Sequence, residues 1–339
     1  MHKYLGVEPL SRWLGKESVI VNKLIHYGIG RLIIERTKFW SALFPLVVKG
    51  LRLTKIALGI FGYLHRKRIA VQISKDSPYR NTISADIGFA ILPPGTFDAV
   101  DQIIPVAKSI YKDHLYRLGC HKADSGYSLL LSSSTVKNRK CQRTDLRYHP
   151  QFQALAAYRP FVEIASAYLG ELPILGFIDL ELILPVADGN YADIGEDLGA
   201  RAFHIDVGGS AGKQVKCFIP VEDVDEGNGA TIVMNAKTSR QLAQATHYSG
   251  GRISDNIVFS DPWRQHLVHT SCPAGSVIFM DTFGMVHCGG RTTTRPRIMI
   301  ILQYTSKYVA AETELQRNRF EFDKHLAMAN PISRQLFDL

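Results

Sequence analysis

The chain has 339 residues, of which 46% are apolar and 21% charged, and its 40 Lys and Arg against 31 Asp and Glu give a net charge of +9. These values are typical of a folded globular protein of one large or two ordinary domains, and they exclude wholesale disorder and fibrous or low-complexity proteins. The excess charge is N-terminal, because residues 1–75 hold 14 Lys and Arg but only three acids.

The N-terminal segment is both apolar and basic. Residues 33–64 are rich in large apolar side chains, which Lys49, Arg52 and Lys55 interrupt. No run reaches the roughly 18 apolar residues of a membrane-spanning helix. The pattern predicts imperfectly amphipathic helices over residues 1–80, which either pack on the rest of the protein or lie on an anionic membrane surface. We favour packing slightly over membrane contact.

The rest of the chain changes from helical to alternating patterns. A strand is predicted over residues 88–92, and helices over 97–107 and 160–169. Short strands without long helices between them then follow over residues 175–184, 203–207, 215–220, 231–234, 276–280 and 297–304. Such a series predicts an antiparallel barrel or sandwich in a domain of residues 81–310, followed by a helical tail, 311–339.

The cysteines and the N-terminus bear on the cell compartment. Five cysteines without a C-x-x-C pair predict neither a disulfide framework nor a structural zinc site: Cys120, Cys141, Cys217, Cys272 and Cys288. The first residues lack the compact apolar core and cleavage site of a signal peptide. We expect a cytoplasmic protein and leave peripheral membrane association open.

Two potential metal ligands, His204 and Asp206, lie near the end of a predicted strand. Residues i and i+2 of an extended chain point to the same side, so both side chains can bind one metal ion. An isolated His-x-Asp triplet is common by chance and more often marks a surface strand. His287 is the best candidate for a second histidine. Two His and one carboxylate form a facial triad, which leaves three adjacent positions of Fe(II) open.

Other polar residues compete for functional roles. The histidines His247, His266 and His269 are alternatives to His287, but we predict that none of them stands on a strand that would fix its direction. Asp179 and Glu181 share one face of a predicted strand. Solvent exposure explains these two acids more simply than acid–base catalysis does.

In these residues the sequence resembles the phytanoyl-CoA dioxygenase family of Fe(II)- and 2-oxoglutarate-dependent oxygenases. The resemblance covers about residues 85–305 and rests on a set of short motifs in the family's order, each weak alone. They begin with a G-F-x-x-L-P strand at residues 88–93, an A-x-x-Y-L-G helix end at 165–170, the His-x-Asp triplet within 203–206 and an acidic turn ending in Asn-Gly at 224–229. A glycine turn before a strand at 275–281, the distal His within 287–290 and a pair of arginines within 295–297 complete the set.

The resemblance implies a mainly β protein with flanking helices, built as a double-stranded β-helix, the jelly roll of cupins. It implies that the two histidines and the aspartate bind Fe(II), with 2-oxoglutarate and O2 as co-substrates. It also implies that Arg297 pairs with the distal carboxylate of 2-oxoglutarate, with Arg295 as the alternative. A solvated charged turn is the simpler reading of both arginines. Nearby hydroxyl donors to the same co-substrate are Thr292, Thr293 and Thr294.

The activity implied by the resemblance is a dioxygenase that hydroxylates an unactivated C–H bond of a small-molecule or lipid-like substrate and releases succinate and CO2. Two other hypotheses stay open: a metal-dependent cupin-like enzyme that is not an oxygenase, and a membrane-surface binding protein with a vestigial metal site. Nucleic acid is not expected as a substrate, because the near-neutral catalytic part lacks a basic, aromatic-lined stripe. The substrate and the oligomeric state are not fixed by the sequence.

Overall fold

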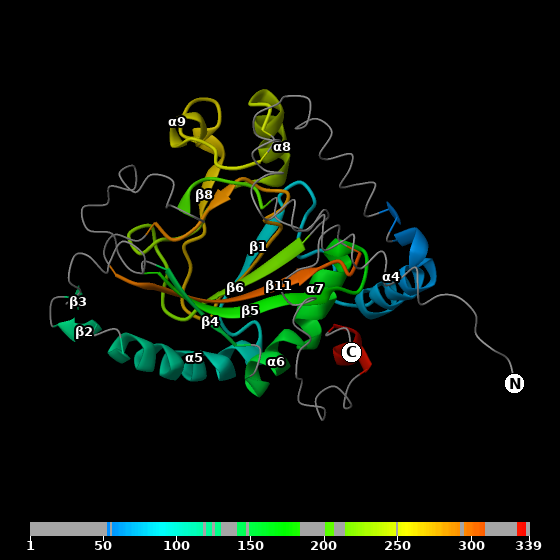
Figure 1. Ribbon diagram of the computed structural model, residues 1–339, viewed down its shortest axis with the longest axis horizontal. Helices are drawn as coiled ribbons and strands as arrows, with labels where there is room; N and C mark the ends of the chain where they lie inside the picture. Colours follow the sequence, from blue (N-terminus) through cyan, green and yellow to red (C-terminus); the bar gives the residue numbers. More distant parts are fainter. Residues whose placement is uncertain are drawn as a thin grey trace, which may run out of the picture.

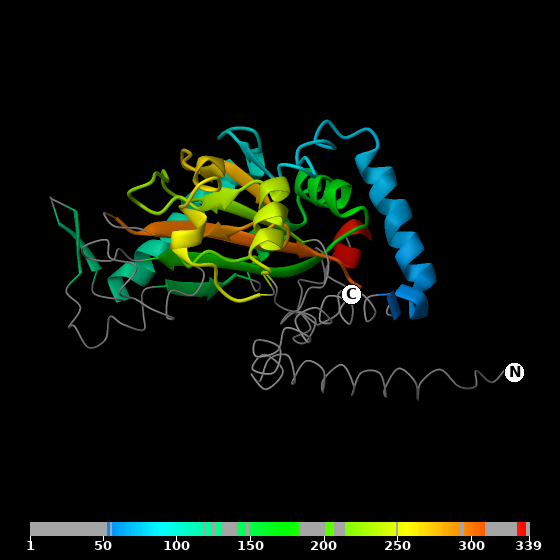
Figure 2. The same cartoon turned by 90° about the horizontal axis from the view of Figure 1, so that it is seen from above.

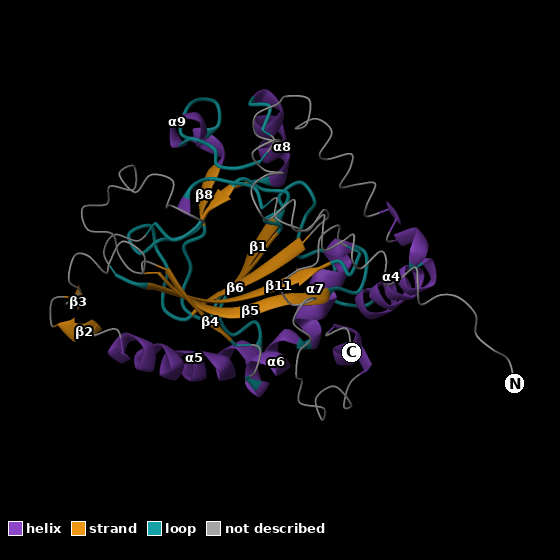
Figure 3. Cartoon of the chain, viewed as in Figure 1, coloured by secondary structure: helices purple, strands orange, loops and turns teal. Residues whose placement is uncertain are grey.

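The computed structural model of the protein describes residues 53–54, 56–117, 120–123, 126–129, 141–146, 149–183, 201–206, 214–248, 250–291, 295–308 and 331–336. Within these ranges the chain forms two antiparallel sheets with helices on their outer sides (Figure 1, Figure 3). Most of the two predicted terminal segments, 1–80 and 311–339, lies outside the described ranges, namely residues 1–52, 55, 311–330 and 337–339. The predicted limits of the three domains therefore stay predictions.

The larger sheet has six strands in the order β1-β9-β6-β11-β5-β4, and every neighbouring pair is antiparallel. It brings together segments that are far apart in the sequence, since β11 near the end of the described chain lies between β5 and β6. The strands are β1 (Phe89–Leu92), β4 (Cys141–Asp145), β5 (Ile174–Ile183), β6 (Gln214–Pro220), β9 (Val277–Met280) and β11 (Arg297–Thr305).

The smaller sheet has the order β10-β7-β8, with β7 (Ile232–Met234), β8 (Leu267–His269) and β10 (His287–Cys288). An isolated antiparallel bridge between His204 and His287 adds one more segment beside β10. Two facing antiparallel sheets with this connectivity make a jelly roll. The predicted fold class is therefore confirmed. A separate hairpin consists of β2 (Cys120–Ala123) and β3 (Gly126–Leu129).

Alternation along β6 separates the two sides of the larger sheet. Cys217 and Ile219 join the apolar core beneath the helices, whereas Phe218 packs between the two sheets. Lys216 and Gln214 share the inward face with Phe218. Because the strand is apolar on one side and mixed on the other, it can cover a core and also line a polar site.

Helices cover the outer faces of both sheets. The large core cluster joins the six-stranded sheet to α5 (Asp98–Arg117), α6 (Pro150–Ala156) and α7 (Arg159–Leu169), which lie along its outer side in Figure 1. A smaller cluster joins the other sheet to α8 (Ala236–Ala245) and α9 (Asp255–Val258), followed by the short η3 (Arg264–His266). The C-terminal α12 (Pro331–Leu336) lies near β5.

The predicted elements agree with the structure where the apolar pattern is long. Each predicted strand has a counterpart, except that residues 203–207 contribute only single bridges at Phe203 and His204. The helix predicted over 97–107 extends to Arg117, past an internal Pro105. Helix α7 ends as predicted at Gly170, whose φ of 73° lies in the left-handed region that glycine tolerates. Five short strands and three α-helices were not predicted: β2, β3, β4, β8, β10, α6, α8 and α9.

The helix α4 (Ile60–Ser74) belongs to the basic N-terminal segment and stands at the margin of the molecule in Figure 2. It packs against α7 and is anchored by the buried Arg66, whose guanidinium donates to the carbonyls of Leu172 and Pro173 at 3.0 and 2.8 Å. One face of α4 therefore packs on the jelly roll, as favoured. In the described ranges no helix is both long and apolar enough to span a bilayer.

Candidate metal centre

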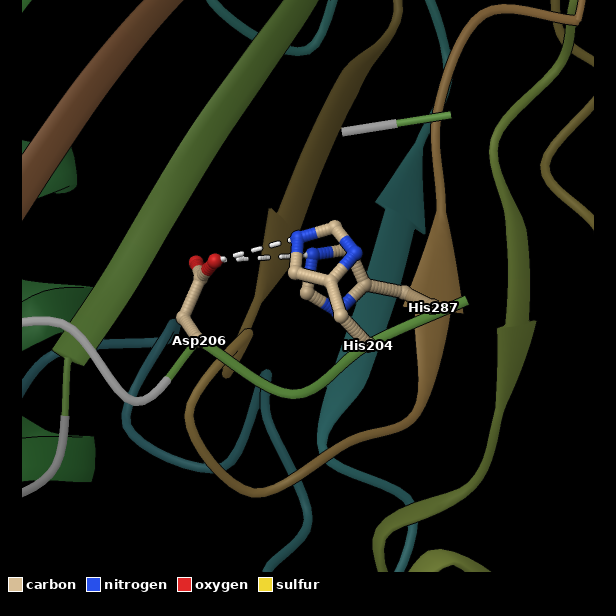
Figure 4. A group of neighbouring side chains, drawn as sticks. All are labelled: His204, Asp206 and His287. Atoms are coloured by element: carbon tan, nitrogen blue, oxygen red, sulfur yellow. Dashed lines mark ion pairs between the residues drawn. The ribbon is translucent and has the colours of Figure 1, made fainter. Parts of the chain in front are cut away.

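The three predicted metal ligands come together in the structure (Figure 4). His204 and His287 face each other across their bridge, with backbone N···O distances of 2.9 and 3.0 Å. Nε2 of His204 lies 3.3 Å and Nε2 of His287 4.0 Å from Oδ1 of Asp206. All three potential ligand atoms lie within 4.8 Å of one another, so these side chains could hold one metal ion.

Backbone carbonyls orient both imidazoles. Nδ1 of His204 lies 2.8 Å from the carbonyl oxygen of Ala202, and Nδ1 of His287 lies 3.0 Å from that of Met285. A carbonyl oxygen only accepts hydrogen bonds, so each Nδ1 carries a proton, and in the neutral form of each imidazole the lone pair is on Nε2, which faces Asp206. Metal-binding histidines are commonly fixed in this way.

The ionisation of the site suits a cation. Burial lowers the pKa of His287 to about 4, although the nearby Asp206 carboxylate opposes the shift. Burial acts to raise the pKa of Asp206, but the opposing contacts, the Lys216 ammonium first among them, hold that pKa well below its usual range. Near neutral pH, His287 is therefore neutral and Asp206 is ionised, which are the forms that bind metal.

The second oxygen of Asp206 is held by a polar network on the inward face of the larger sheet. Oδ2 accepts from Lys216 Nζ at 2.6 Å and from Gln214 Nε2 at 2.9 Å. The amide of Gln214 is fixed in turn, because it donates to Thr282 Oγ1 at 2.6 Å and accepts from Gln303 Nε2 at 2.6 Å. The network leaves Oδ1 directed at the two imidazoles.

Arg297, the predicted contact of 2-oxoglutarate, starts β11 and is 3% exposed. Its guanidinium donates to Glu181 Oε1 at 2.9 Å, to Thr231 Oγ1 at 3.1 Å and to the Gly229 carbonyl at 3.2 Å. The remaining Nε is buried and has no hydrogen-bond partner among the described atoms. The alternative reading of Arg297 as part of a solvated charged turn is therefore wrong.

The burial of Glu181 also differs from the prediction. We predicted that it and Asp179 face solvent, but Glu181 is only 4% exposed and Asp179 is half-buried. The two acids do share a strand face, but this face points to the interior of the jelly roll, where Glu181 meets Arg297. Solvent exposure therefore does not explain Glu181.

The other predicted co-substrate residues lie elsewhere or outside the described ranges. Arg295 is partly exposed and donates to Asp225 Oδ2 and to the carbonyl of Asp223, both at 3.1 Å. It therefore ties down the acidic turn that precedes β7. The hydroxyl donors Thr292, Thr293 and Thr294 lie outside the described residues.

The competing histidines do not join the cluster of ligands found in the described part of the chain. His247 follows α8, and His266 ends η3. His269 is the last residue of β8, so the expectation that it stands on no strand is wrong. The three-residue strand is too short to show alternation. Cys288 is 1% exposed in an apolar cluster, which fits a packing role.

Sequence reasoning missed Lys216, Gln214 and the role of Glu181. The signal was nevertheless present, because each is a polar residue in an otherwise apolar strand: β6 reads QVKCFIP and β5 reads ILGFIDLELI. Polar residues two positions apart in such strands share a face. In a sheet covered on both sides, that face must hold a partner or a ligand.

Two further contacts hold the loops that carry the ligands. Arg291 forms a bidentate pair with Asp255, at 2.6 and 2.8 Å, and donates to the carbonyl of Arg201 next to the His204 segment. Tyr168 on α7 donates to Asp281 Oδ2 at 2.6 Å, and Oδ1 of the same carboxylate accepts from two backbone N–H groups of the loop before His287. Both ligand segments are therefore tied to neighbouring elements.

No protein-family model and no curated protein matches the sequence. Among solved structures, the epimerase SnoN in complex with Fe3+, alpha ketoglutarate and nogalamycin RO is 15% identical, over 70% of this chain and 84% of that one, with a TM-score of 0.41. The carbocyclase SnoK from nogalamycin biosynthesis is 13% identical, over 74% and 92%, with a TM-score of 0.44. HygX from Streptomyces hygroscopicus, with nickel and 2-oxoglutarate bound, is 12% identical, over 67% and 85%, with a TM-score of 0.43.

These identities and TM-scores are low, so the chemistry of this chain is inferred from its own side chains. The phytanoyl-CoA dioxygenase resemblance stays a prediction, because no family model supports it. What the described residues establish is a jelly roll whose interior brings two oriented imidazoles and one ionised carboxylate to a common point.

Proposed function

We propose that the protein is an Fe(II)- and 2-oxoglutarate-dependent dioxygenase that hydroxylates a C–H bond of a small-molecule or lipid-like substrate and releases succinate and CO2. One observation carries the proposal: Nε2 of His204, Nε2 of His287 and Oδ1 of Asp206 converge inside a jelly roll, with both Nδ1 atoms held by carbonyls. Two His and one carboxylate with open positions form the donor set of non-haem Fe(II) oxygenases.

The residues fit the metal well. His204, His287 and Asp206 would hold it through three atoms of the expected types, and the network at Asp206 Oδ2 favours a single coordinating oxygen. Bound Fe(II) with 2-oxoglutarate would supply the oxidising chemistry. The chain's own contribution is to fix the three donors, to keep His287 neutral and to place them between two sheets.

The fit to 2-oxoglutarate rests on Arg297. Its buried Nε lacks a partner among the described atoms, so it can still donate to a carboxylate. Glu181 already neutralises the guanidinium, however, and a second carboxylate beside it must tolerate that negative charge. Lys216, on the same inward face and 2.6 Å from Asp206, is the other cation near the site.

The Glu181–Arg297 pair also favours a second candidate function, a metal-dependent cupin-like enzyme that is not an oxygenase. In such an enzyme, Arg297 needs no co-substrate, and a buried ion pair with Glu181 is sufficient reason for its presence. Both candidates need the same three metal ligands, so they differ in the binding of 2-oxoglutarate.

Anaerobic titration with Fe(II), then 2-oxoglutarate, separates the two candidates without a known substrate. The dioxygenase should develop a weak visible charge-transfer band that is absent in His204→Ala and weakened in Arg297→Gln. Arg295→Gln is the matched control, because it removes a guanidinium from the partly exposed pair with Asp225 and should leave the band unchanged. Fe(II) binding without any effect of 2-oxoglutarate would favour the second candidate, and no metal binding by folded protein would refute both.

A further inference from the structure

The helix α4 carries large apolar side chains on its outer side, where an ordinary surface helix exposes polar ones. Its buried residues are Arg66, Ala70 and Ser74, which are small or charged. Of its large apolar residues, Ile69 and Ile73 are half-buried against the core, but others point outward: Phe61 is 86% exposed and Leu64 is 53% exposed. A helix on a soluble domain normally buries its apolar stripe and exposes its polar one. Packing on the jelly roll explains Ile69 and Ile73, but not the outward side chains of Phe61, Leu64 and Val71.

The exposed apolar residues are concentrated at this helix. Of the large apolar side chains that are exposed in the described ranges, most belong to α4 and the helical residues before it: Leu53, Leu58, Ile60, Phe61, Leu64 and Val71. The others are Ile87 in a loop, Ile257 and Phe259 in and just after α9, and Val268 in β8. A concentrated apolar surface of this kind marks an interaction site, whereas single exposed residues need no explanation.

Basic residues share this surface. Spacings of three and four residues place Phe61, Leu64, Arg68, Val71 and Lys75 on one stripe of α4, here called the outer stripe, and all five are exposed. No acid occurs in the sequence between residues 36 and 75. The outer stripe therefore offers apolar side chains to insert and positive charges to pair with anions.

The charges of the outer stripe also indicate which kind of partner it binds. A second copy of α4 would bring its arginine and lysine against those of the first, with no acid to balance them. Residues 1–52 of the same chain are basic overall as well, with nine Lys and Arg against three acids. An anionic lipid surface complements both features, because acyl chains accept the apolar side chains and headgroups accept the bases.

We propose that the outer stripe of α4 binds the surface of an anionic phospholipid bilayer, with Phe61, Leu64 and Val71 inserted below the headgroups. The helix would lie in the plane of the interface rather than cross it. The anchor of Arg66 on the carbonyls of Leu172 and Pro173 would then fix the jelly roll to the membrane through α7 and β5. This binding is independent of the metal centre.

Co-sedimentation of the full-length protein with vesicles tests the proposal, comparing phosphatidylcholine alone with phosphatidylcholine mixed with phosphatidylglycerol. We expect binding to the anionic vesicles at low salt and at least about tenfold weaker binding in the variant Phe61→Ser/Leu64→Ser/Val71→Ser. Arg68→Glu/Lys75→Glu should have a similar effect. The matched control is Ile87→Ser/Ile257→Ser/Val268→Ser, which removes three exposed apolar residues away from α4 and should bind as the wild type does.

Three outcomes would overturn the proposal. Wild-type protein that stays in the supernatant with anionic vesicles at low salt would refute membrane binding. Equal loss of binding in the control variant would show that the effect is not specific to the outer stripe. A lower melting temperature of the serine variant, or loss of a dimer in gel filtration, without any vesicle binding would show that the stripe is covered by this chain or by a second copy.

Discussion

The buried pair of Glu181 and Arg297 can be tested by a single isosteric change, Glu181→Gln. The two side chains are 5% and 3% exposed and meet at 2.9 Å. Glutamine keeps the shape and an acceptor oxygen but removes the negative charge, so the guanidinium is left buried without a counter-ion. Breaking a buried pair from one side costs about 3–5 kcal/mol. Because glutamine still accepts a hydrogen bond, we expect the lower end, a loss of about 3 kcal/mol in the free energy of unfolding.

The assay is urea unfolding followed by circular dichroism, with Arg295→Gln measured alongside. Arg295 and Asp225 form an ion pair whose side chains are 39% and 59% exposed, so its loss should cost less than about 1 kcal/mol. The difference between the two losses in the free energy of unfolding measures the effect of burial, since each variant removes one charge from one ion pair. A Glu181→Gln variant as stable as Arg295→Gln would refute the view that the buried pair is required for the fold.

A second measurement on the Glu181→Gln variant tests whether Arg297 binds 2-oxoglutarate. If Arg297 receives the distal carboxylate, that carboxylate restores the counter-ion that Glu181→Gln has lost. 2-Oxoglutarate, added with a redox-inert divalent metal, should therefore raise the melting temperature more in the variant than in the wild type. An equal or smaller rise in the variant would contradict the assignment of Arg297 to the co-substrate while leaving the structural role of the pair intact.

Three other predictions follow from the contacts around the site. Gln214→Leu removes one of the donors that orient Asp206 and should weaken Fe(II) binding at least about tenfold in a competition titration; an unchanged affinity would show that Lys216 suffices. Tyr168→Phe removes a 2.6 Å hydrogen bond to the buried Asp281 and should lower the free energy of unfolding by about 2 kcal/mol in a urea titration. Burial raises the pKa of the described thiols, so peptide mapping after native alkylation near pH 8 should find unmodified Cys217, Cys272 and Cys288.

The jelly roll could be predicted because its longer strands carry their own signal. β5, β6 and β11 are seven to ten residues long and apolar on at least one face, so their positions follow from the sequence alone. The site could be anticipated because its ligands come from a His-x-Asp triplet and one distant histidine. Chain order places His287 near the end of the fold, but only the bridge with His204 brings the two imidazoles together.

The other strands and contacts depend on how strands pair with one another, which local sequence patterns do not encode. β10 consists of two residues and exists only because it pairs with β7, so no period could reveal it. Glu181 is an acid in an apolar strand, and the sequence alone cannot distinguish an outward carboxylate from one that faces a buried arginine. The register of β5 against β11 decides this, since it places Glu181 beside Met299, within reach of Arg297.

The charges inside the jelly roll bear on the kind of ligand that the metal site can bind. Asp206 with Lys216, and Glu181 with Arg297, form two pairs that are each neutral without metal. A divalent cation at the histidines therefore adds two positive charges, of which the half-buried Asp179 on the same inward face can balance at most one, and in a site of low dielectric the excess favours an anionic ligand. A dicarboxylate would supply two negative charges, and the proposed role of Arg297 would pair one of them with its guanidinium. Charge balance thus supports 2-oxoglutarate, and replacing Glu181 by glutamine should strengthen its binding.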